Sequence, residues 1–467
     1  MKKTSPVKNS RRIKILFLSA EIAPLAKVGG LADVLGALPK ALDKDVCEIR
    51  MCLPFYGCID IKKYPVKLIT NNLSVHLNNK KEKFSLYNTY LPGTRIPVYL
   101  IKHYFFSSKK IYMSEKKNNE SVNVRRFAFF TRASLKAMEF LFFQPGIIHA
   151  HDWHTALAPD MIKDRKKINR FYSRTKILYT IHNLANQGKT GGKNFMAEGI
   201  LGANLVNTVS PAYAKEILTH EFGAGLEKKL QKKKKSLSGI LNGIDTAEYN
   251  PQIDPLVRYH FTSGSIREKI KNKLFLQKKL GWKPDKKILL AGVVTRLTGQ
   301  KGIELFTEKL ISQVNSIKKP WQIVFLGTGE KKYEKQLKNL AKKYPKNIKT
   351  LIRFDEKLAR QIYAGSDLFL VPSKFEPCGL TQMIAMRYGS IPIVRATGGL
   401  KDTVNPGVGF SFKNYTSEAL AHALIKALDR YYNKPGLWKK LQLNGMKKDF
   451  SWKKSAGEYL KLYKKLT

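Results

Sequence analysis

Short apolar runs alternate along the first half of the chain with longer segments in which apolar residues recur at helical spacing. The run at residues 13–19 (I-K-I-L-F-L-S) is typical of a buried strand. Helices are expected at 32–42 and, as a long amphipathic segment, at 124–143. The further strands predicted in this half lie at 48–53, 96–102, 146–151, 176–182 and 204–209. This alternation predicts an α/β fold built on a parallel, doubly wound sheet.

A second strand–helix series begins at Lys287, after turn-forming residues around Asn250 and Pro251. After the run that starts there, its strands are expected at 322–326, 350–354, 367–371 and 391–395. We therefore predict two doubly wound domains, residues 1–250 and 251–450, with a cleft between them. The F-S-W step at 450–452 interrupts the preceding helical pattern. Residues 451–467 are expected to form a helix that packs back on the first domain.

The composition is that of an ordinary globular protein. A length of 467 residues suffices for two domains with separate cores, and 43% of the residues are hydrophobic. No apolar run approaches the ~20 residues that a membrane helix needs, and no cleavage-type segment follows the basic start. We expect no membrane partner and a cytoplasmic location. The four cysteines (Cys47, Cys52, Cys58 and Cys378) suggest neither a disulfide framework nor a zinc motif.

The formal net charge of +50 invites comparison with nucleic-acid-binding proteins. Lysine is scattered over every segment, however, and the densest run, at 228–235, resembles a solvated helix or loop face. No aromatic-basic platform or nucleic-acid module accompanies that run. We expect no specific nucleic acid as a partner, only weak attraction to anionic polymers.

The stretch 372–382 (P-S-K-F-E-P-C-G-L-T-Q) follows a predicted strand and precedes a predicted helix that starts near Leu380. Ligands of open α/β sheets bind at such carboxyl ends of strands. Glu376 offers a carboxylate for sugar hydroxyls, Gly379 allows close backbone approach, and the helix amides suit phosphate. The pattern favours a sugar nucleotide. A surface loop in which Glu376 merely caps the helix is the alternative.

Two further loops carry positive charge beside glycine. Lys27 precedes Gly29 and Gly30 in the turn between the first strand and the first helix, which suits phosphate or sugar. A tight turn without a ligand is the alternative. Arg296 and Lys301 lie five residues apart on the loop that leaves the first strand of the second series. Neither loop has the spacing of a dinucleotide fingerprint or a P-loop, so nicotinamide and ATP are not indicated.

Polar clusters end two strands of the first domain, H-A-H-D-W-H at 149–154 and I-H-N-L-A-N-Q-G at 181–188. Three histidines and an acid within six residues could suggest a metal site. Alternate residues of an extended run point to opposite faces, however, so their convergence on one ion is awkward. His182 is the better candidate for a polar site, and a satisfied core histidine is its structural alternative.

Eight motifs, in this order along residues 13–460, together resemble the bacterial glycogen synthase and plant starch synthase family. They are K-V-G-G-L-A-D-V, H-A-H-D-W-H, I-H-N-L-A-N-Q-G, N-T-V-S-P-A-Y-A-K-E-I, G-I-L-N-G-I-D, R-L-T-G-Q-K-G, P-S-K-F-E-P-C-G-L-T-Q and T-G-G-L-K-D-T-V. The resemblance implies a GT-B fold, with an acceptor-side first domain and a nucleotide-sugar-binding second domain. It also implies retaining transfer of glucose from ADP-glucose to the non-reducing 4-hydroxyl of an α-1,4-glucan such as glycogen.

The resemblance also assigns roles to residues. Arg296 and Lys301 would hold the donor diphosphate, Glu376 would lie near the glucose, and His182 would contact the donor sugar. The other donor-binding residues that it implies are Lys27, Gly29, Gly30, Asp33, Asn242, Phe354, Cys378, Gly379, Leu380 and Thr381, with Asp152 and Asn186 on the acceptor side. Fixed cations can stabilise a leaving diphosphate. We therefore expect no metal and no cofactor.

The chain departs from the family pattern at three places. Asn186 stands where the family has an aromatic residue, Phe354 replaces the more usual tyrosine, and a few tens of residues are missing after Gly188. The missing residues would fall on the acceptor side. Two alternatives stay open: a related GT-B transferase with another acceptor or UDP-glucose, and a glucan-binding homologue that has lost turnover. The retention of Lys27, Arg296, Lys301 and Glu376 together argues against lost turnover.

Overall fold

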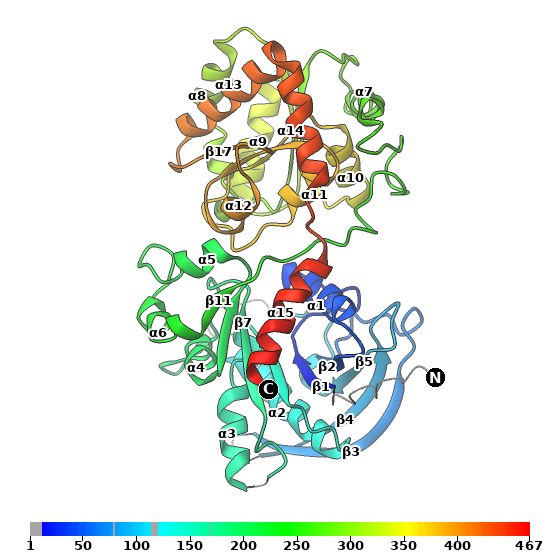
Figure 1. Cartoon of the computed structure of the whole chain (residues 1–467), viewed down its shortest axis with the longest axis vertical. Coiled ribbons are helices and arrows are strands. Elements are labelled where there is room, and N and C mark those ends of the chain that lie inside the picture. The colour runs from blue at the N-terminus through cyan, green and yellow to red at the C-terminus, as the bar shows by residue number, and fades with distance from the viewer. Residues whose placement is uncertain (1–11, 78–79, 114–119, 169) are drawn as a thin grey trace, which may run out of the picture. The chain divides into compact units, whose positions relative to one another are not determined.

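The computed structural model describes residues 12–77, 80–113, 120–168 and 170–467, and Figure 1 shows the elements that they form. The chain divides into two compact units. The first unit lies within Met1–Val209, Ala214–Ile240 and Trp452–Thr467. The second comprises Ser210–Tyr213 and Leu241–Ser451. Each unit is built on its own sheet, and each is described here by itself.

The first unit contains a nine-stranded sheet in the order β11-β10-β7-β6-β1-β2-β5-β4-β3. Its parallel strands are β1 (Ile13–Leu18), β2 (Cys47–Pro54), β5 (Pro97–Lys102), β6 (Ile147–His151), β7 (Lys176–Ile181), β10 (Leu205–Thr208) and β11 (Leu237–Gly239). Each begins within two residues of a predicted strand, which for β11 is the strand that the sequence predicts from Ser238 toward the turn residues near Asn250. Buried apolar residues dominate β1, β6 and β7, as strands covered on both faces require.

The prediction of a purely parallel sheet is wrong at one edge. The strands β3 (Lys67–Leu77) and β4 (Lys80–Tyr90) pair with each other antiparallel, and β4 also pairs antiparallel with β5. Both strands mix exposed and buried positions and carry many charged or polar residues. A strand that is only partly covered lacks the continuous apolar run by which the parallel strands are identified.

Three helices of the first unit begin within four residues of the predicted ones: α1 (Gly30–Ala41), α2 (Glu120–Phe140) and α15 (Trp452–Leu466). The unit also contains α3 (Ala158–Ile168), α4 (Phe195–Gly202) and α6 (Glu227–Lys232), for which no helix was predicted. The short helix α5 (Pro211–Glu216) begins in residues assigned to the second unit. The last helix, α15, packs beside α1, and its Tyr459 and Tyr463 are completely buried.

The second unit contains a six-stranded parallel sheet in the order β14-β13-β12-β15-β16-β17. Its strands are β12 (Leu289–Val294), β13 (Trp321–Leu326), β14 (Ile348–Leu351), β15 (Leu368–Val371), β16 (Ile391–Arg395) and β17 (Phe410–Phe412). The strand predicted at 350–354 lies two to three residues earlier in the structure, because pairing with β13 begins at Ile348 and ends at Leu351. Phe354 therefore lies outside the strand and is 88% exposed.

Helices flank this second sheet, and several begin at the polar caps expected of helix starts. They are α7 (Lys269–Lys279), α8 (Glu308–Asn315), α9 (Lys331–Lys343), α10 (Glu356–Gly365), α11 (Thr381–Arg387), α12 (Gly398–Thr403), α13 (Ser417–Asn433) and α14 (Pro435–Lys447). Thr307, Asp355 and Thr416 each accept a backbone N–H in the first turn of the helix that follows. These caps fix where α8, α10 and α13 begin.

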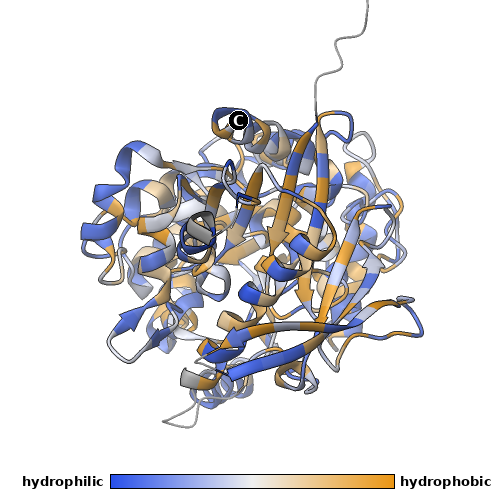
Figure 2. Ribbon diagram, turned by 90° about the horizontal axis from the view of Figure 1, so that it is seen from below, coloured by the Kyte–Doolittle hydropathy of each residue, from blue (hydrophilic) through white to orange (hydrophobic). Residues whose placement is uncertain are grey.

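The apolar residues lie inside and most lysines outside. In Figure 2, hydrophobic positions concentrate on the strands, whereas many helices show hydrophilic stretches. Helix α9 illustrates this separation, since Leu337 and Leu340 are buried while lysines such as Lys338 are exposed. In the part of the chain that the structure describes, no helix is long and apolar enough to cross a membrane.

Candidate active site

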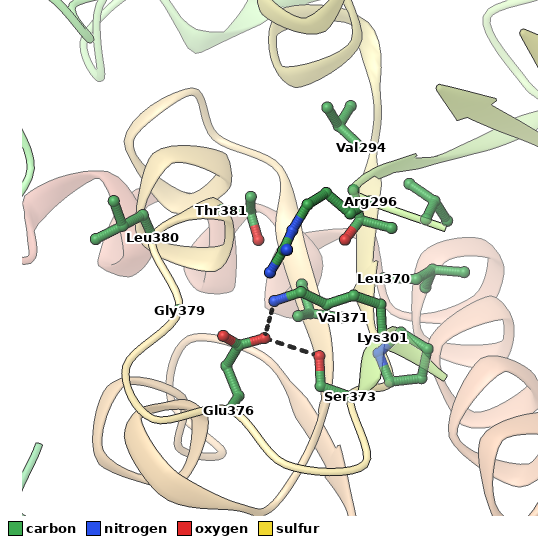
Figure 3. Close-up of a pocket in the computed structure, with 13 residues that line it drawn as sticks. Val294, Arg296, Lys301, Leu370, Val371, Ser373, Glu376, Gly379, Leu380 and Thr381 are labelled. Carbon is green, nitrogen blue, oxygen red and sulfur yellow. Dashed lines mark hydrogen bonds and ion pairs between the residues drawn. The ribbon is translucent and has the colours of Figure 1, made fainter. Parts of the chain in front are cut away.

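A pocket lies at the carboxyl ends of β12 and β15 in the second unit (Figure 3). It is lined by Val293, Val294, Thr295, Arg296, Lys301, Leu370, Val371, Pro372, Ser373, Glu376, Gly379, Leu380 and Thr381. Apolar strand residues therefore form one part of its wall, and the charged and glycine-containing loops form the rest. Six residues that the sequence nominates are brought together here: Arg296, Lys301, Glu376, Gly379, Leu380 and Thr381.

The carboxylate of Glu376 is held by two side chains that converge on one oxygen. Lys301 Nζ lies 2.6 Å from Glu376 Oε2, and the Ser373 hydroxyl donates to the same oxygen at 2.9 Å. Both charged side chains are largely buried. Leu380, not Glu376, is the N-cap residue of α11, and no side chain caps that helix. The alternative reading of Glu376 as a helix cap is therefore wrong.

The loop that carries Lys301 is locked to the loop that carries Glu376. Lys374 N donates to Gln300 O at 2.8 Å, and Gln300 Nε2 donates to Phe375 O at 3.3 Å. Gly302, which follows Lys301, has φ +72°, and a Cβ atom there would lie 2.1 Å from Pro372 O in the other loop. Only glycine fits this conformation and this contact. The short 3₁₀ turn Gly299–Lys301 is thus fixed against β15's loop.

Two glycines after β16, Gly398 and Gly399, contact the backbone of the loop that carries Glu376. Gly399 N donates to Glu376 O at 3.1 Å, and a Cβ atom at Gly398 would lie 2.0 Å from that oxygen. Gly379 has φ +75°, and Gln382 Nε2 donates to its carbonyl oxygen at 2.8 Å. The sequence analysis names Gly398 and Gly399 only as part of the family motif T-G-G-L-K-D-T-V. In the structure, the pair allows close packing against the backbone of Glu376.

Arg296 completes the charge of the pocket. It follows β12, its side chain is exposed, and Figure 3 shows it pointing toward the same part of the pocket as Lys301. Two cations and one carboxylate leave a net positive charge at this end of the sheet. Such a set can bind an anion through charge-assisted hydrogen bonds while the carboxylate accepts from hydroxyl groups.

The glycine turn of the first unit is already occupied by a carboxylate from its own chain. Glu21 Oε2 accepts from Val28 N at 2.7 Å and from Gly29 N at 2.9 Å, and Tyr112 donates to Glu21 Oε1 at 2.5 Å. A phosphate at the Gly29 amide would therefore compete with this carboxylate. The sequence analysis missed Glu21 and Tyr112. In the sequence, Glu21 is marked only as an acid between apolar residues in the A-E-I link that follows β1.

Lys27 and Asp33 form an ion pair with each other, at 2.6 Å between Nζ and Oδ1. Half of the lysine side chain is exposed, so water screens the pair. A Cβ atom at either Gly29 or Gly30 would meet no atom within 4 Å. The turn is thus open on the side of both glycines.

The two histidine-bearing strand ends of the first unit also meet. His151, the last residue of β6, and His182, just after β7, face each other with 3.0 Å between Nδ1 and Nε2. Asp152 Oδ1 accepts from His182 N at 2.7 Å. The φ angle of Asp152 is +51°, a conformation that non-glycine residues rarely adopt and that often marks functional sites.

Burial sets the charge state of this cluster. It lowers the pKa of His182 to about 3 and that of His154 to about 3 as well. It raises the pKa of Asp152 to about 7, although the backbone N–H groups of His182 and Asn183 oppose that rise. His182 is therefore a neutral imidazole near neutral pH, with one N–H donor and one acceptor nitrogen. No group of three or more His, Cys, Asp or Glu in the described residues is placed to hold a metal ion.

The other nominated residues lie outside the pocket lining. Cys378 is buried, and burial raises the pKa of its thiol to about 12, so it stays protonated. Asn242 is buried, and its Oδ1 has no hydrogen-bond partner among the described residues. Phe354 is exposed, and Asn186 is an exposed residue between β7 and the next short strand. These positions stay predictions on grounds of resemblance alone.

Two protein families match consecutive parts of the chain. The starch synthase catalytic domain matches residues 14–232, and the family described as glycosyl transferases group 1 matches residues 272–441. The second match contains the whole pocket described above. The first contains the glycine turn and both histidine-bearing strand ends.

Individual relatives match over nearly the full length. Glycogen synthase of Thermosipho melanesiensis is 40% identical, with 97% of this chain and 99% of the relative covered. That of Kosmotoga olearia is 42% identical, with 97% and 98% covered. The catalytic domain of starch synthase IV from Arabidopsis thaliana, a structure with bound ADP and acarbose, has a TM-score of 0.87 at 32% identity, covering 97% of this chain and 99% of that one. The chain therefore belongs to the glycogen synthase and starch synthase family and has its two-domain GT-B fold.

Proposed function

We propose that the chain transfers glucose, with retention of configuration, from ADP-glucose to the non-reducing 4-hydroxyl of an α-1,4-glucan. Membership of the family makes it a glucosyltransferase with a nucleotide-sugar donor and a glucan acceptor. The observation that supports the proposal most is the pocket in which Arg296, Lys301 and Glu376 line one end of the second sheet. A cytoplasmic location is part of the same proposal.

Arg296 and Lys301 supply the charge that a departing nucleoside diphosphate requires. Negative charge on the diphosphate grows as its bond to the sugar breaks, so fixed cations stabilise the transition state more than the ground state. Lys301 is paired with Glu376 in this structure, at 2.6 Å. On donor binding, we expect Lys301 Nζ to share its protons between that carboxylate and a phosphate oxygen.

In this proposal, the carboxylate of Glu376 contacts the glucosyl group of the donor. Its carboxylate lies in the pocket and is oriented by Ser373 as well as by Lys301. It can accept from glucose hydroxyls or stabilise positive charge that develops at the anomeric carbon. The backbone of Gly379 and the start of α11 at Thr381 offer amide donors beside it.

The remaining assignments concern the first unit and the nucleobase. Lys27 would add a third cation for the diphosphate, and His182 would contact the donor sugar as a neutral imidazole. The exposed ring of Phe354 could stack on a purine. We favour ADP over UDP because the Arabidopsis starch synthase structure contains ADP.

Transfer of labelled glucose to glycogen tests the proposal directly. ADP-glucose and UDP-glucose are offered separately, each with and without a chelator. We expect incorporation from ADP-glucose that the chelator leaves unchanged, because the cations of the pocket replace a metal. Faster incorporation from UDP-glucose would overturn the donor assignment. Loss of activity on chelation, restored by Mg²⁺ or Mn²⁺, would overturn the leaving-group assignment, and no incorporation from either donor would favour a glucan-binding homologue.

A further inference from the structure

Behind His182 lies a row of buried rings on one face of the first sheet. His149 and His151 are two residues apart on β6, so their side chains share a face, and their ring centroids are 4.1 Å apart. Phe17 on β1 lies parallel to the His151 ring, with 5.9 Å between centroids and 10° between planes. His149 and His151 are completely buried. The His151 ring therefore has little freedom to reorient.

The backbone of His151 is fixed as well. Its N–H donates to Thr155 Oγ1 at 2.7 Å, and that hydroxyl donates back to His151 O at 3.0 Å. The ring nitrogen Nδ1 then meets Nε2 of His182 at 3.0 Å. Both pKa values are lowered by burial, so two neutral imidazoles share this contact. One ring must donate the proton and the other must accept it.

The burial of the remaining nitrogen of His151 indicates which ring donates. His151 Nε2 is inaccessible to solvent and has no hydrogen-bond partner among the residues that the structure describes. A buried N–H without an acceptor is more costly and rarer than an unused lone pair. The proton of His151 therefore belongs on Nδ1, which donates to His182 Nε2. His182 must then carry its own proton on Nδ1.

Hydrogen bonds that involve the last helix, α15, orient the ring of His149. His149 Nδ1 lies 2.9 Å from the Tyr463 hydroxyl of α15, and its Nε2 lies 2.6 Å from Thr180 Oγ1. Thr180 donates to Asn207 Oδ1, and Asn207 Nδ2 donates to the Tyr459 hydroxyl at 3.2 Å. Because the single Thr180 proton goes to Asn207, His149 must donate from Nε2 and accept from Tyr463. Every partner of His149 thus has one defined proton position.

We propose that His151 is a positioning residue, which orients the His182 ring and holds its proton on Nδ1. The inference rests on the proposed function, in which His182 contacts the donor sugar. A His182 ring with N–H at Nδ1 offers a donor to a sugar hydroxyl oxygen. Without His151, the His182 ring would lose its fixed tautomer and its fixed angle. The hydrogen bond from His182 to the sugar would then be misaligned, and this should affect kcat more than the binding of ADP-glucose.

Two substitutions of similar shape separate hydrogen bonding from packing. Asparagine places an amide near the position of Nδ1, whereas leucine has the same branching and no polar atom. We expect His151→Leu to lower kcat at least about 10-fold, which is the size of effect seen when a residue that orients a functional group is removed. The KM for ADP-glucose should change less than about 3-fold, and His151→Asn should recover most of the lost kcat. Both variants lose the ring contacts, and asparagine also buries an amide group, so His151→Asn should unfold at a temperature no higher than His151→Leu. A higher kcat of His151→Asn then cannot result from greater stability.

The exposed His422 on α13 serves as a matched control, and His422→Leu should keep full activity. Equal losses of kcat in His151→Leu and His151→Asn would overturn the proposal, since packing alone would then explain them. A large rise in KM with unchanged kcat would overturn it as well.

A spectroscopic readout tests the tautomer without any turnover. In protein labelled with ¹⁵N-histidine, long-range proton–nitrogen spectra show which ring nitrogen carries the proton. The His182 signals are assigned by their absence in His182→Asn. We expect His182 protonated on Nδ1 in the unaltered chain, and mixed or reversed protonation in His151→Leu. Protonation on Nε2 in the unaltered chain would overturn the proposal. An Nδ1 proton without glucosyl transfer would refute the proposed function and leave this inference standing.

Discussion

At the scale of single residues, an ion pair fixes the position of the lysine to which the proposed function assigns the leaving group. Lys301 is paired with the Glu376 carboxylate at 2.6 Å, and both side chains are mostly removed from water. Partial burial strengthens such a pair relative to an exposed one. The pair also holds Lys301 Nζ at the pocket wall, so little conformational freedom is lost when a phosphate binds beside it.

Replacing Lys301 by alanine should lower kcat by roughly 100-fold or more, because a cation at the leaving group acts mainly on the transition state. The KM for glycogen should stay within a few-fold of its original value. Lys338→Ala, on the exposed face of α9, is the matched control and should leave the steady-state kinetics unchanged. Unchanged kcat with only a raised KM for ADP-glucose would instead show that Lys301 binds ground state and transition state equally.

Asp152 should leave a signature in the pH dependence of stability. Burial raises its pKa from 3.8 to about 7, so between these values the folded chain retains a proton that the unfolded chain has released. Its contribution to the free energy of unfolding therefore falls as the pH rises through this range. The lowered pKa values of His154 and His182 act in the opposite direction. Because the unfolded chain binds these protons more readily, the contribution of both histidines to the free energy of unfolding falls as the pH falls.

Asp152→Asn isolates the carboxyl group, since both histidines are present in both proteins and the amide oxygen can still accept from His182 N. Relative to the unaltered chain, the variant should gain stability by on the order of 1 kcal/mol or more between pH 4 and pH 7. Urea unfolding at several pH values in this range measures the difference. A difference that stays constant with pH would show that Asp152 titrates normally in the folded state.

At the scale of elements, the sequence predicted the parts of the fold whose signal is local. β1 and β16 are short apolar runs that are buried on both faces, and both lie where the pattern predicts them. β3 and β4 were missed because strands that are only partly covered have no such run. The strand predicted at 350–354 was displaced because pairing with β13, a non-local contact, decides where β14 lies.

The same division holds for the candidate site. Arg296, Lys301 and Glu376 were nominated because they follow strands, and the carboxyl ends of parallel strands meet in space. The ion pair between Lys301 and Glu376 could not be predicted, since it joins loops that are 75 residues apart. Nor could the occupation of the Gly29 amide by Glu21, because that contact depends on how the link after β1 folds back.

Gly302 connects these loops, and its replacement by alanine should disturb the site without touching a charge. The residue has φ +72°, and a Cβ atom would lie 2.1 Å from Pro372 O. Strain of this kind costs about 1–3 kcal/mol before the clash is counted. We expect Gly302→Ala to destabilise the chain by at least about 2 kcal/mol and to lower kcat, because the position of Lys301 depends on this turn.

Gly436→Ala is the control for that change. Gly436 lies in the first turn of α14, and a Cβ atom there meets no atom within 4 Å. Alanine should be neutral or stabilise the helix by up to about 1 kcal/mol. Denaturant unfolding of both variants measures the contrast. Equal stability of the two would show that the loop around Gly302 moves freely enough to accept a side chain.

At the scale of the whole molecule, the chain returns at its end to the unit in which it began. Residues Trp452–Thr467 belong to the first unit, and α15 buries Tyr459 and Tyr463 there. The hydroxyl groups of both tyrosines reach the hydrogen-bonded network of β6, β7 and β10. The last helix therefore contributes to the environment of the histidine cluster as well as to the core.

The segment that follows Gly188 is the one that the sequence analysis expects to be shortened on the acceptor side. After Gly188, the chain forms only a small hairpin, β8 (Lys189–Thr190) and β9 (Lys193–Asn194), before α4 begins. Gly191 and Gly192, at φ +51° and +75°, make its turn. The alignment with the Thermosipho melanesiensis glycogen synthase spans 484 positions against 467 residues here, so that relative has residues where this chain has none.

If the missing residues fall in this hairpin, the chain should handle acceptors differently and donors normally. A shorter loop buries less of a glucan chain, and each lost stacking contact is worth about 1 kcal/mol. We expect a KM for maltotetraose several-fold above that of the Thermosipho melanesiensis enzyme. The KM for glycogen should differ less, because its many chain ends raise the effective concentration. The KM for ADP-glucose should match.

A graft tests whether the hairpin itself is responsible. A Cβ atom at Gly191 or Gly192 would meet no atom within 4 Å, so the turn has room for an insertion. Where the Thermosipho melanesiensis enzyme proves longer at this point, its additional residues are inserted between these two glycines, and a Gly-Ser segment of equal length is the control. The graft should lower the KM for maltotetraose, and the control segment should not. If maltotetraose binds equally well to both natural enzymes and the KM for ADP-glucose differs instead, the shortened segment acts on the donor, and its placement on the acceptor side is wrong.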